Sequence, residues 1–279
     1  MLVAAIVVTY NPYTVDLFCN VLTYSRNVNY VIIVDNSTIE QVKNDIMYWS
    51  STHGFIYEDM EGNKGIAVAL NRGIELAIIH NCSWVLTMDQ DSFFQSGIDG
   101  FWDYIGRNNE SNNIIFIAPT YCVSNSKCML KTTGIQRSKF IWQSGNLVNV
   151  SNYLKLGPYM ERLFIDYVDY EYCLRARMHK YDYFQIPSVV LNHNPGNVMV
   201  GHLGGFKYKY HDSTLVRYYY FIRNGLYVSF LYKDLDCLIQ LLKIVIKVLC
   251  VEQNKKNKCL YMLRGLIDLM NKRFYKLSE

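Results

Sequence analysis

Proline is scarce in this sequence, with five residues in 279, and charged residues make up only 19% of the chain against 51% hydrophobic residues. Disordered chains are rich in charge and poor in hydrophobic residues, and collagen-like chains are rich in proline, so both classes are excluded. A chain of this length can bury a large core. We therefore expect a globular protein with one large domain, with or without a small appendage.

Paired cysteine spacings are also missing. The eight cysteines are scattered through predicted strands and helices, and no two of them form a Cys-x-x-Cys pair. This distribution fits neither a zinc cage nor a disulfide scaffold, so we expect reduced thiols of the kind that cytosolic proteins carry.

No hydrophobic run is long enough to cross a membrane. The longest candidate is interrupted by Lys243 and Lys247, and it falls short of the roughly 18 apolar residues that a spanning helix needs. The apolar N-terminus has no basic segment in front of it and is broken at Thr9, so we expect a first buried strand rather than a signal peptide. The sequence predicts a cytoplasmic protein whose membrane contact, if it has one, is peripheral and at the inner face of the cell membrane.

Short apolar runs alternate with amphipathic segments in the first half of the chain. This alternation is typical of an α/β fold with a mostly parallel, Rossmann-like sheet and helices on both faces. We expect strands at 3–8, 31–34, 55–58 and 84–88, with helices at 15–24, 40–50 and 65–80. Farther along, strands are expected at 114–118, 143–150 and 184–192, and helices at 169–180 and 212–232.

Three of the predicted strands end in polar clusters. These clusters are Thr9-Tyr10-Asn11, Asp35-Asn36-Ser37 and Asp89-Gln90-Asp91. In open α/β sheets, ligands bind outside the carboxyl ends of the strands, so we expect the three clusters to converge on one site.

The last part of the chain differs from the rest. From residue 231 onward it holds ten Lys or Arg against five Asp or Glu, and its helical segments are amphipathic. We expect a main domain at 1–232 and a basic helical tail at 233–279. Such helices can lie on an anionic membrane surface, or they can pack on the main domain or on a second subunit of a homodimer, and the sequence leaves these alternatives open.

Asp89 and Asp91 offer two carboxylates at the end of one strand, which suit a hard cation such as Mg²⁺ or Mn²⁺. The alternative is an ordinary solvated loop. His193 also stands at a strand-to-loop edge, where a neutral imidazole could complete a metal site with Asp91.

The segment 164–175 contains Asp166, Asp169 and Glu171 on an apolar and aromatic background. These carboxylates could simply cap a helix, or an apolar pocket could raise the proton affinity of one of them until it serves as a general base. The following aromatic helix is best explained as core packing. Arg217 and Arg223 within it are hard to bury unpaired, so one of them is expected to meet a diphosphate or the Asp169 region.

Taken in order, the segments form a recognisable set. They are TYNP, VDNS, GNKGIAVALNRGI, TMDQDS, WQSGNL, FIDYVDYEYCLRAR, NHNPG and RYYYFIRN. The chain resembles the family 2 inverting glycosyltransferases of the GT-A fold, and among them the bacterial rhamnosyltransferase-like branch, over about residues 3–230.

The resemblance implies a role for each matched residue. Asp169 takes the position of the catalytic base, while Val168 stands where the family has Glu, which leaves Asp166 and Glu171 as candidates to share the role. Asp91 is implied as the principal metal ligand, Asp89 as a ribose or metal contact, and His193 as a later ligand. The donor would be held by Thr9, Tyr10, Asp35, Asn63, Gly65, Asn71, Asp89, Ser144, Gly145 and Arg217.

The implied activity is a metal-dependent, inverting transfer of a sugar, with L-rhamnose from dTDP-rhamnose as the expected donor. The implied acceptor is a hydroxyl of a cell-surface polysaccharide precursor, such as a lipid-linked oligosaccharide of an O-antigen or capsule. A UDP-hexose donor and a non-catalytic partner that binds nucleotide sugar are the alternatives. A nucleic-acid partner is not expected, because the basic excess lies on an apolar helical tail.

Overall fold

The computed structural model describes residues 1–107, 113–123, 134–193, 198–203 and 206–277. The chain divides into two compact units. The first comprises Met1–Tyr159 and Tyr172–Asn194, and the second comprises Met160–Glu171 and Pro195–Glu279. The predicted helical tail at 233–279 is part of the second unit, which also takes in residues that precede it.

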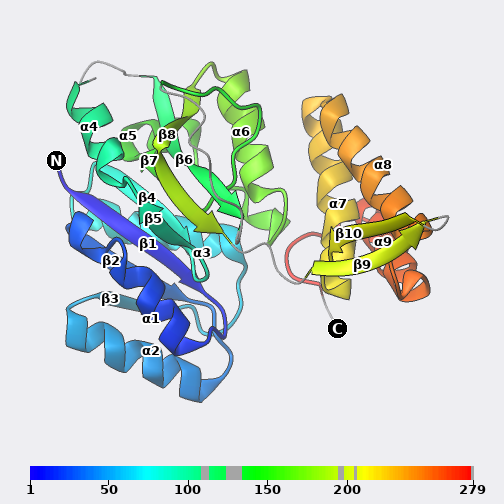
Figure 1. The fold of residues 1–279 in the computed structure, drawn as a ribbon, viewed down its shortest axis with the longest axis horizontal. Coiled ribbons are helices and arrows are strands. Elements are labelled where there is room, and N and C mark those ends of the chain that lie inside the picture. The colour runs from blue at the N-terminus through cyan, green and yellow to red at the C-terminus, as the bar shows by residue number, and fades with distance from the viewer. Residues whose placement is uncertain (108–112, 124–133, 194–197, 204–205, 278–279) are drawn as a thin grey trace. The chain divides into compact units, whose positions relative to one another are not determined.

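The first unit is built around an eight-stranded sheet with the order β3-β2-β1-β4-β7-β6-β8-β5 (Figure 1). Its parallel half consists of β1 (Val3–Thr9), β2 (Tyr30–Asp35), β3 (Ile56–Asp59) and β4 (Trp84–Asp89). In the other half, β6 and β8 are parallel, whereas β7 and β5 run antiparallel to their neighbours. These strands are β5 (Phe93–Ser96), β6 (Ile114–Val123), β7 (Asn146–Asn149) and β8 (Asp182–His193). The predicted mostly parallel α/β sheet is confirmed.

Helices cover both faces of this sheet. Side chains of a strand alternate between the two faces, so each strand presents residues to the helices on both sides. Ala5 and Val7 share a buried cluster with Phe101 of α4 (Asp99–Arg107). On the opposite face, Gly73 of α3 (Ile66–Ile79) lies so close to Ile6 that a Cβ there would come within 2.5 Å of Ile6 Cγ2. The helices predicted at 15–24, 40–50, 65–80 and 169–180 are confirmed apart from their ends, as α1 (Thr14–Leu22), α2 (Glu40–His53), α3 and α6 (Val168–Met178).

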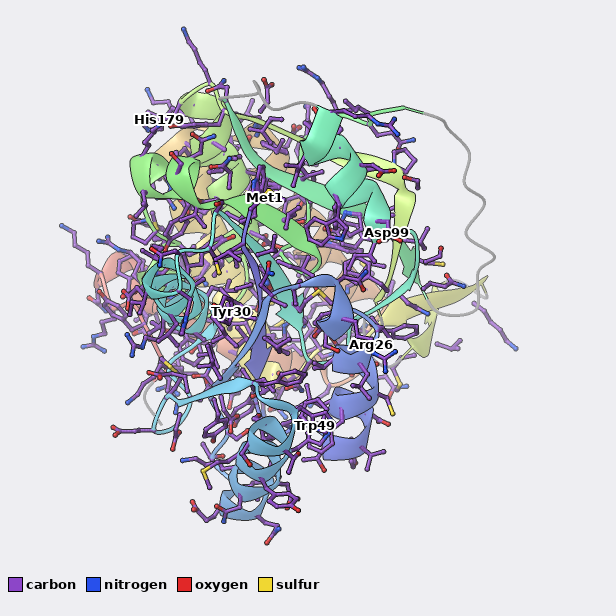
Figure 2. The ribbon with its side chains drawn as sticks, turned by 90° about the vertical axis from the view of Figure 1, so that its left-hand side faces the viewer. Met1, Arg26, Tyr30, Trp49, Asp99 and His179 are labelled. Carbon is purple, nitrogen blue, oxygen red and sulfur yellow. The ribbon has the colours of Figure 1, made fainter. Side chains whose placement is uncertain are left out.

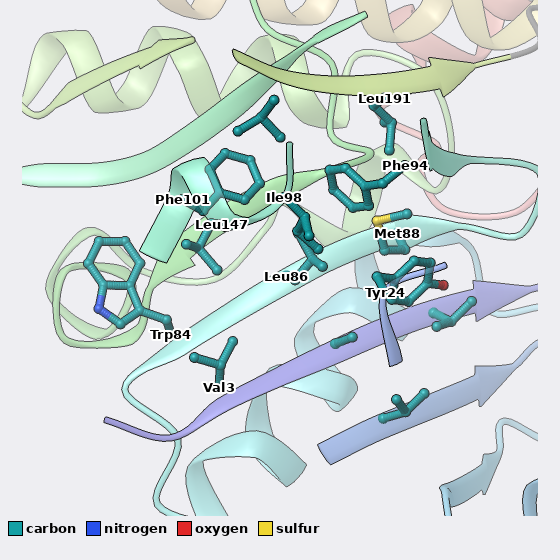
Figure 3. Packing of buried hydrophobic residues seen from close by; sticks show 14 of the residues in the cluster. Val3, Tyr24, Trp84, Leu86, Met88, Phe94, Ile98, Phe101, Leu147 and Leu191 are labelled. Carbon is teal, nitrogen blue, oxygen red and sulfur yellow. The ribbon is translucent and has the colours of Figure 1, made fainter. Parts of the chain in front are cut away.

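The main core lies between β1, β4 and their neighbours on the α4 side. Trp84, Leu86 and Met88 of β4 line it beside Phe94 and Phe101 (Figure 3). At its margin α1 and α2 lie side by side, with Trp49 on α2 (Figure 2). Phe18 of α1 stacks on Trp49 with ring centroids 4.0 Å apart. The short elements η1 (Ser25–Asn27) and α5 (Val150–Leu156) complete this unit.

The second unit is mainly helical. It contains η2 (Glu161–Leu163), the hairpin of β9 (Val198–Leu203) and β10 (Phe206–His211), and α7 (Leu215–Tyr232), α8 (Leu235–Cys250) and α9 (Lys255–Met270). Tyr218 and Ile222 of α7 pack with Leu241 of α8 and Met262 of α9, so the aromatic residues of α7 form a core, as predicted. Across the described ranges, no helix combines the length and the apolar character that a membrane span requires.

The cysteines agree only in part with the prediction of reduced thiols. Six of the described cysteines carry free thiols, namely Cys19, Cys82, Cys173, Cys237, Cys250 and Cys259. Cys122 is disulfide-bonded, so the prediction is wrong at this position.

Candidate functional site

The ends of β1 and β2 are joined through the Asp35 carboxylate. The parallel register pairs Thr9 with Asp35, and Thr9 Oγ1 donates a hydrogen bond of 2.7 Å to Asp35 Oδ1. The Ser37 amide donates to the same oxygen, and the Tyr57 hydroxyl donates to Oδ2 at 3.0 Å. Burial and the Asp35 charge raise the pKa of Tyr57 well above its ordinary value, so its hydroxyl remains a donor. Asp35 and Thr9 are fully buried, so they support this edge of the sheet from inside the protein.

The loop before α3 is tied to the same edge. Asn36 accepts a hydrogen bond from the Lys64 amide at 3.0 Å, and its own amide group donates to the Gly65 carbonyl at 3.4 Å. Within the loop, Asn63 Oδ1 accepts from the Gly65 amide at 3.0 Å. Gly65 has a φ of 95°, a conformation that favours glycine, and α3 starts at the next residue. The sequence predictions for Asn63 and Gly65 therefore fall on a loop fixed beside the end of β2.

The end of β4 reaches the first cluster through Gln90, and the first cluster is joined to the second. The Tyr10 amide donates to Gln90 Oε1 at 2.7 Å, and Asn20 Nδ2 of α1 donates to the Gln90 carbonyl at 3.0 Å. In the second cluster, Ser37 Oγ accepts from the Asn11 amide at 2.8 Å. The predicted convergence of the three strand ends is thus confirmed, and the exposed Tyr10 directly follows the buried Thr9.

Ser144 and Gly145 lie beside the acidic cluster. The Asp89 amide donates to Ser144 Oγ at 3.1 Å, and the Gly145 amide donates to the Thr87 carbonyl at 2.6 Å. Gly145 has a φ of 82°, and a Cβ there would meet Pro119 Cγ at 2.8 Å, so the turn requires glycine. The structure therefore brings these two residues to the end of β4, as expected for residues near a shared site.

Asn71 of α3 is buried and makes hydrogen bonds within the protein. Its Oδ1 accepts from the Tyr153 hydroxyl and from the Tyr159 amide, each at 2.9 Å, and its Nδ2 donates to the Tyr159 carbonyl at 3.0 Å. Because Asn71 is also buried, its contacts in the structure hold α3 against the segment after α5.

The acidic cluster has the donor chemistry of a hard-cation site. Asp91 is exposed and receives no hydrogen bond from the described part of the chain, while Asp89 is half-buried at the end of β4. Phe93 of β5 pairs with Asn192 of β8, so Asp91 stands two residues before this pair in the sequence and His193 one residue after it. The side chain of His193 lies outside the described residues. Within the described residues, no group of three metal-ligating side chains is assembled.

The three carboxylates of the 164–175 segment have different partners and different burial in the second unit. Asp166 is nearly buried and forms an ion pair with Arg217, whose Nε lies 3.2 Å from Asp166 Oδ1. Glu171 is fully buried and accepts a hydrogen bond of 2.5 Å from the Tyr232 hydroxyl. Asp169, in the first turn of α6, is half-buried, and its Oδ1 accepts from the Tyr170 amide at 2.8 Å.

The two arginines of α7 have different environments. Arg217 is half-exposed and reaches the segment that carries Asp169 by its ion pair with Asp166, as the sequence predicted for one of the two. Arg223 is fully buried and donates to the carbonyls of Leu163 and Tyr275 at 3.1 and 2.8 Å. Backbone carbonyls, rather than a ligand, therefore satisfy Arg223.

Sequence reasoning missed three residues that shape the site. Gln90 and Asn36 were noted only as members of polar clusters, and Tyr57 was assigned only to a strand. The position of Gln90 between the two aspartates of the predicted cation site could have identified it. Nothing local marks Tyr57, since its contact with Asp35 arises from the pairing of β2 with β3.

Comparisons with known proteins agree with this geometry. No family model matches the chain. The chain is 25% identical over 287 residues to the dTDP-rhamnosyl transferase RfbF of Shigella flexneri, and the match covers 96% of this chain and 94% of that protein. The chain is a glycosyltransferase with the GT-A fold. Its resemblance to the rhamnosyltransferase-like branch of family 2 extends over nearly the whole sequence.

Solved structures of low sequence identity share the fold. The structure of S. aureus TarS 1–349 in complex with UDP matches with a TM-score of 0.54 and 12% identity, over 97% of this glycosyltransferase and 72% of that chain. A structure of GalNAc-T7 with UDP, GalNAc and Mn²⁺ matches with a TM-score of 0.58 and 14% identity over 69% of this chain. This glycosyltransferase spans only 43% of the length of the GalNAc-T7 chain.

Proposed function

We propose that this glycosyltransferase moves one sugar from a nucleoside-diphosphate donor to a hydroxyl group of a glycan acceptor, with inversion at the anomeric carbon. The convergence of the ends of β1, β2 and β4 is the observation that carries the proposal. It creates one edge where an exposed Tyr10, a glycine loop before α3 and two aspartates adjoin each other. A nucleotide sugar needs contacts to its base, its diphosphate and its sugar, and this edge offers a group for each.

Thr9, Tyr10 and Asp35 are proposed to hold the base, with Asn63 and Gly65 toward the diphosphate. Thr9 and Asp35 are buried, so they support the pocket floor, whereas Tyr10 is exposed and its ring is available for stacking. The amides at the start of α3 favour a negatively charged ligand because the helix dipole is positive there. Ser144 and Gly145 are proposed to lie near the transferred sugar because they adjoin Asp89.

Asp169 is the proposed general base. Its place in the 164–175 segment is that of the catalytic base in the family that the chain resembles, and it is half-buried in the first turn of α6. Asp166 forms an ion pair with Arg217, and Glu171 is fully buried against Tyr232. In the proposed reaction Asp169 takes the proton of the acceptor hydroxyl, and that oxygen attacks the anomeric carbon from the face opposite the nucleotide. The bond to the diphosphate breaks as the new one forms, so a β-linked rhamnose donor gives an α-rhamnosyl product.

Asp89 and Asp91, with His193, are the residues proposed to hold a divalent cation, Mn²⁺ or Mg²⁺. The exposed Asp91 carboxylate and the half-buried Asp89 supply the oxygen ligands that both ions prefer. When bound, the ion would neutralise charge on the diphosphate leaving group. The GalNAc-T7 structure, which contains Mn²⁺ and UDP, supports this part of the proposal.

dTDP-rhamnose is the proposed donor, because RfbF is named a dTDP-rhamnosyl transferase and matches along almost its entire length. A UDP-hexose donor is the second candidate, since both similar solved structures contain UDP. The proposed acceptor is a lipid-linked precursor of a cell-surface polysaccharide. The reaction would then take place in the cytoplasm, with the enzyme peripheral to the inner face of the membrane.

The test is donor turnover by the purified full chain with Mn²⁺ or Mg²⁺, measured as released nucleoside diphosphate. dTDP-rhamnose is compared with UDP-glucose, UDP-galactose and UDP-N-acetylglucosamine. Turnover of dTDP-rhamnose alone, lost with chelator, is the expected result. Preference for a uridine donor would overturn the rhamnosyl assignment but keep the mechanism, and nucleotide binding without turnover would favour a non-catalytic partner.

A further inference from the structure

One face of α8 carries a row of exposed apolar side chains. Leu235, Ile239, Leu242, Ile246 and Leu249 are each between 50% and 71% exposed. We refer to these five residues as the α8 seam. The opposite face of the same helix is buried against α7 through Cys237, Leu241 and Val248. The seam is therefore additional to the face that α8 needs for its own fold.

The spacing of the seam is that of a helix–helix contact. Its residues follow one another at intervals of 4, 3, 4 and 3, which is the alternation of the a and d positions of a coiled coil. Helices that lie in a membrane surface carry, in addition to an apolar face, a strongly basic polar face.

The charges beside the seam do not favour an anionic membrane. Asp236 follows the first seam residue and Lys243 follows the third, so the same flank carries one charge of each sign. Lys247 already forms an ion pair with Glu252, with 2.7 Å between Nζ and Oε1. Attraction to anionic lipid is worth about 1 kcal/mol for each basic residue near the surface, and here an acidic neighbour offsets it.

We propose that the α8 seam binds the α8 seam of a second copy of this chain, in an antiparallel pair related by a two-fold axis. In this arrangement Asp236 of each copy lies opposite Lys243 of the other, because residues of the same flank face each other in antiparallel coiled coils. A parallel pair would instead set each charge beside the apolar flank that contains Leu238. The antiparallel contact is self-complementary and closes as a dimer.

The area buried by one pair of α8 seams determines the protein concentration at which dimers are expected. α8 has 16 residues and is about 24 Å long, so one pair of seams buries less than the roughly 800 Å² per partner of a standard interface. We therefore expect a dissociation constant on the order of micromolar.

The first experiment is sedimentation velocity on the full chain over a concentration series that brackets this range. The wild-type mass is expected to rise from 32.6 kDa toward twice that value as the concentration increases. Leu242→Glu is expected to remain at 32.6 kDa throughout, with an unchanged circular dichroism spectrum. The matched control Gln240→Glu adds the same charge to an exposed position of α8 outside the seam, and it should dimerise like the wild type.

A charge exchange tests the orientation separately. Asp236→Lys alone and Lys243→Asp alone are each expected to weaken dimerisation about tenfold, and the double variant is expected to restore it. Two equally weakened single variants without restoration would overturn the antiparallel pairing. A chain that stays monomeric at every concentration would overturn the proposal, and so would a dimer that Leu242→Glu leaves unchanged. A monomeric chain that sediments with vesicles of phosphatidylglycerol and phosphatidylcholine, and loses this binding in Leu242→Glu, would assign the seam to a membrane instead.

Discussion

Thr9 and Asp35 end neighbouring parallel strands, and the Thr9 hydroxyl donates a 2.7 Å hydrogen bond to the fully buried Asp35 carboxylate. This contact links the two strand ends, and the exposed Tyr10 is the next residue after Thr9. The shape of the proposed base pocket therefore depends on a charge that no solvent reaches, and each of its donors is needed to satisfy that charge.

Thr9→Val keeps the shape of the side chain and removes this donor. We expect the free energy of unfolding to fall by about 1–3 kcal/mol, because a buried carboxylate loses one of its hydrogen bonds. Nucleotide affinity should fall as well, since the strand ends are no longer tied. Urea denaturation and calorimetric titration with nucleoside diphosphate measure the two effects. Thr52→Val, at an exposed position of α2, is the matched control and should change neither quantity.

Asp169→Asn tests the proposed base. The amide cannot accept the acceptor proton, so kcat should fall about 10²- to 10⁴-fold while nucleotide affinity stays near that of the wild type. Asp103→Asn, on the exposed surface of α4, makes the same chemical change away from the site and should retain activity. Full activity of Asp169→Asn would contradict the assignment and direct attention to Asp166 or Glu171.

Asp91→Asn tests the proposed cation site independently of turnover. Loss of one carboxylate ligand should weaken Mn²⁺ binding by an order of magnitude or more, as read by electron paramagnetic resonance of free Mn²⁺ in the presence of nucleotide. Chelator should lower nucleotide affinity in the wild type and have little further effect in the variant. Unchanged Mn²⁺ affinity would exclude Asp91 as a ligand.

A buried ionic cluster in the second unit should control stability. Lys258 Nζ lies 2.7 Å from Glu252 Oε2 and 2.8 Å from Asp212 Oδ1, and both Lys258 and Glu252 are buried. Lys258→Met removes one of the two positive charges that pair with the buried Glu252 carboxylate. It should destabilise the unit by about 3–5 kcal/mol. Lys256→Met, at an exposed position of the same helix, should have little effect on urea denaturation.

The same cluster predicts a pH dependence. Burial alone would raise the pKa of Glu252, but Lys247 and Lys258 outweigh it and hold that pKa below the ordinary 4.5. Burial alone would lower the pKa of Lys258, but Asp212 and Glu252 raise it above the ordinary 10.5. The stabilisation is therefore complete between these values, is lost as the pH falls below 4.5 through the folded pKa of Glu252, and is lost as it rises above 10.5 through that of Lys258. A stability profile of Lys258→Met with the same two limbs as the wild type would contradict this account.

The α/β alternation and the convergence of Thr9, Asp35 and Asp89 could be predicted from the sequence, because both follow from local patterns. A short apolar run between amphipathic segments is buried as a parallel strand, and parallel strands bring their carboxyl ends to one edge. Gly65 and Gly145 also lie in motifs that could be read from the sequence. Both residues adopt a positive φ, which is a local requirement that glycine meets.

Only the tertiary structure distinguished the carboxylates at 166, 169 and 171. Their partners Arg217 and Tyr232 are 51 and 61 residues away in the sequence, and no local pattern encodes such pairings. The same holds for Asn71, whose side-chain amide donates a hydrogen bond to the Tyr159 carbonyl, 88 residues away.

The helical tail shows most clearly which features follow from the sequence and which arise from tertiary packing. Its sequence determined that 233–279 forms amphipathic, basic helices, because the spacing of Gln240, Lys243 and Lys247 fixes a polar stripe on a largely apolar helix. It did not determine which apolar residues are buried, because Leu241 and Leu242 are chemically alike. Packing of α8 against α7 buries Leu241 and leaves Leu242 exposed, and that choice, made by contacts with a different helix, creates the α8 seam.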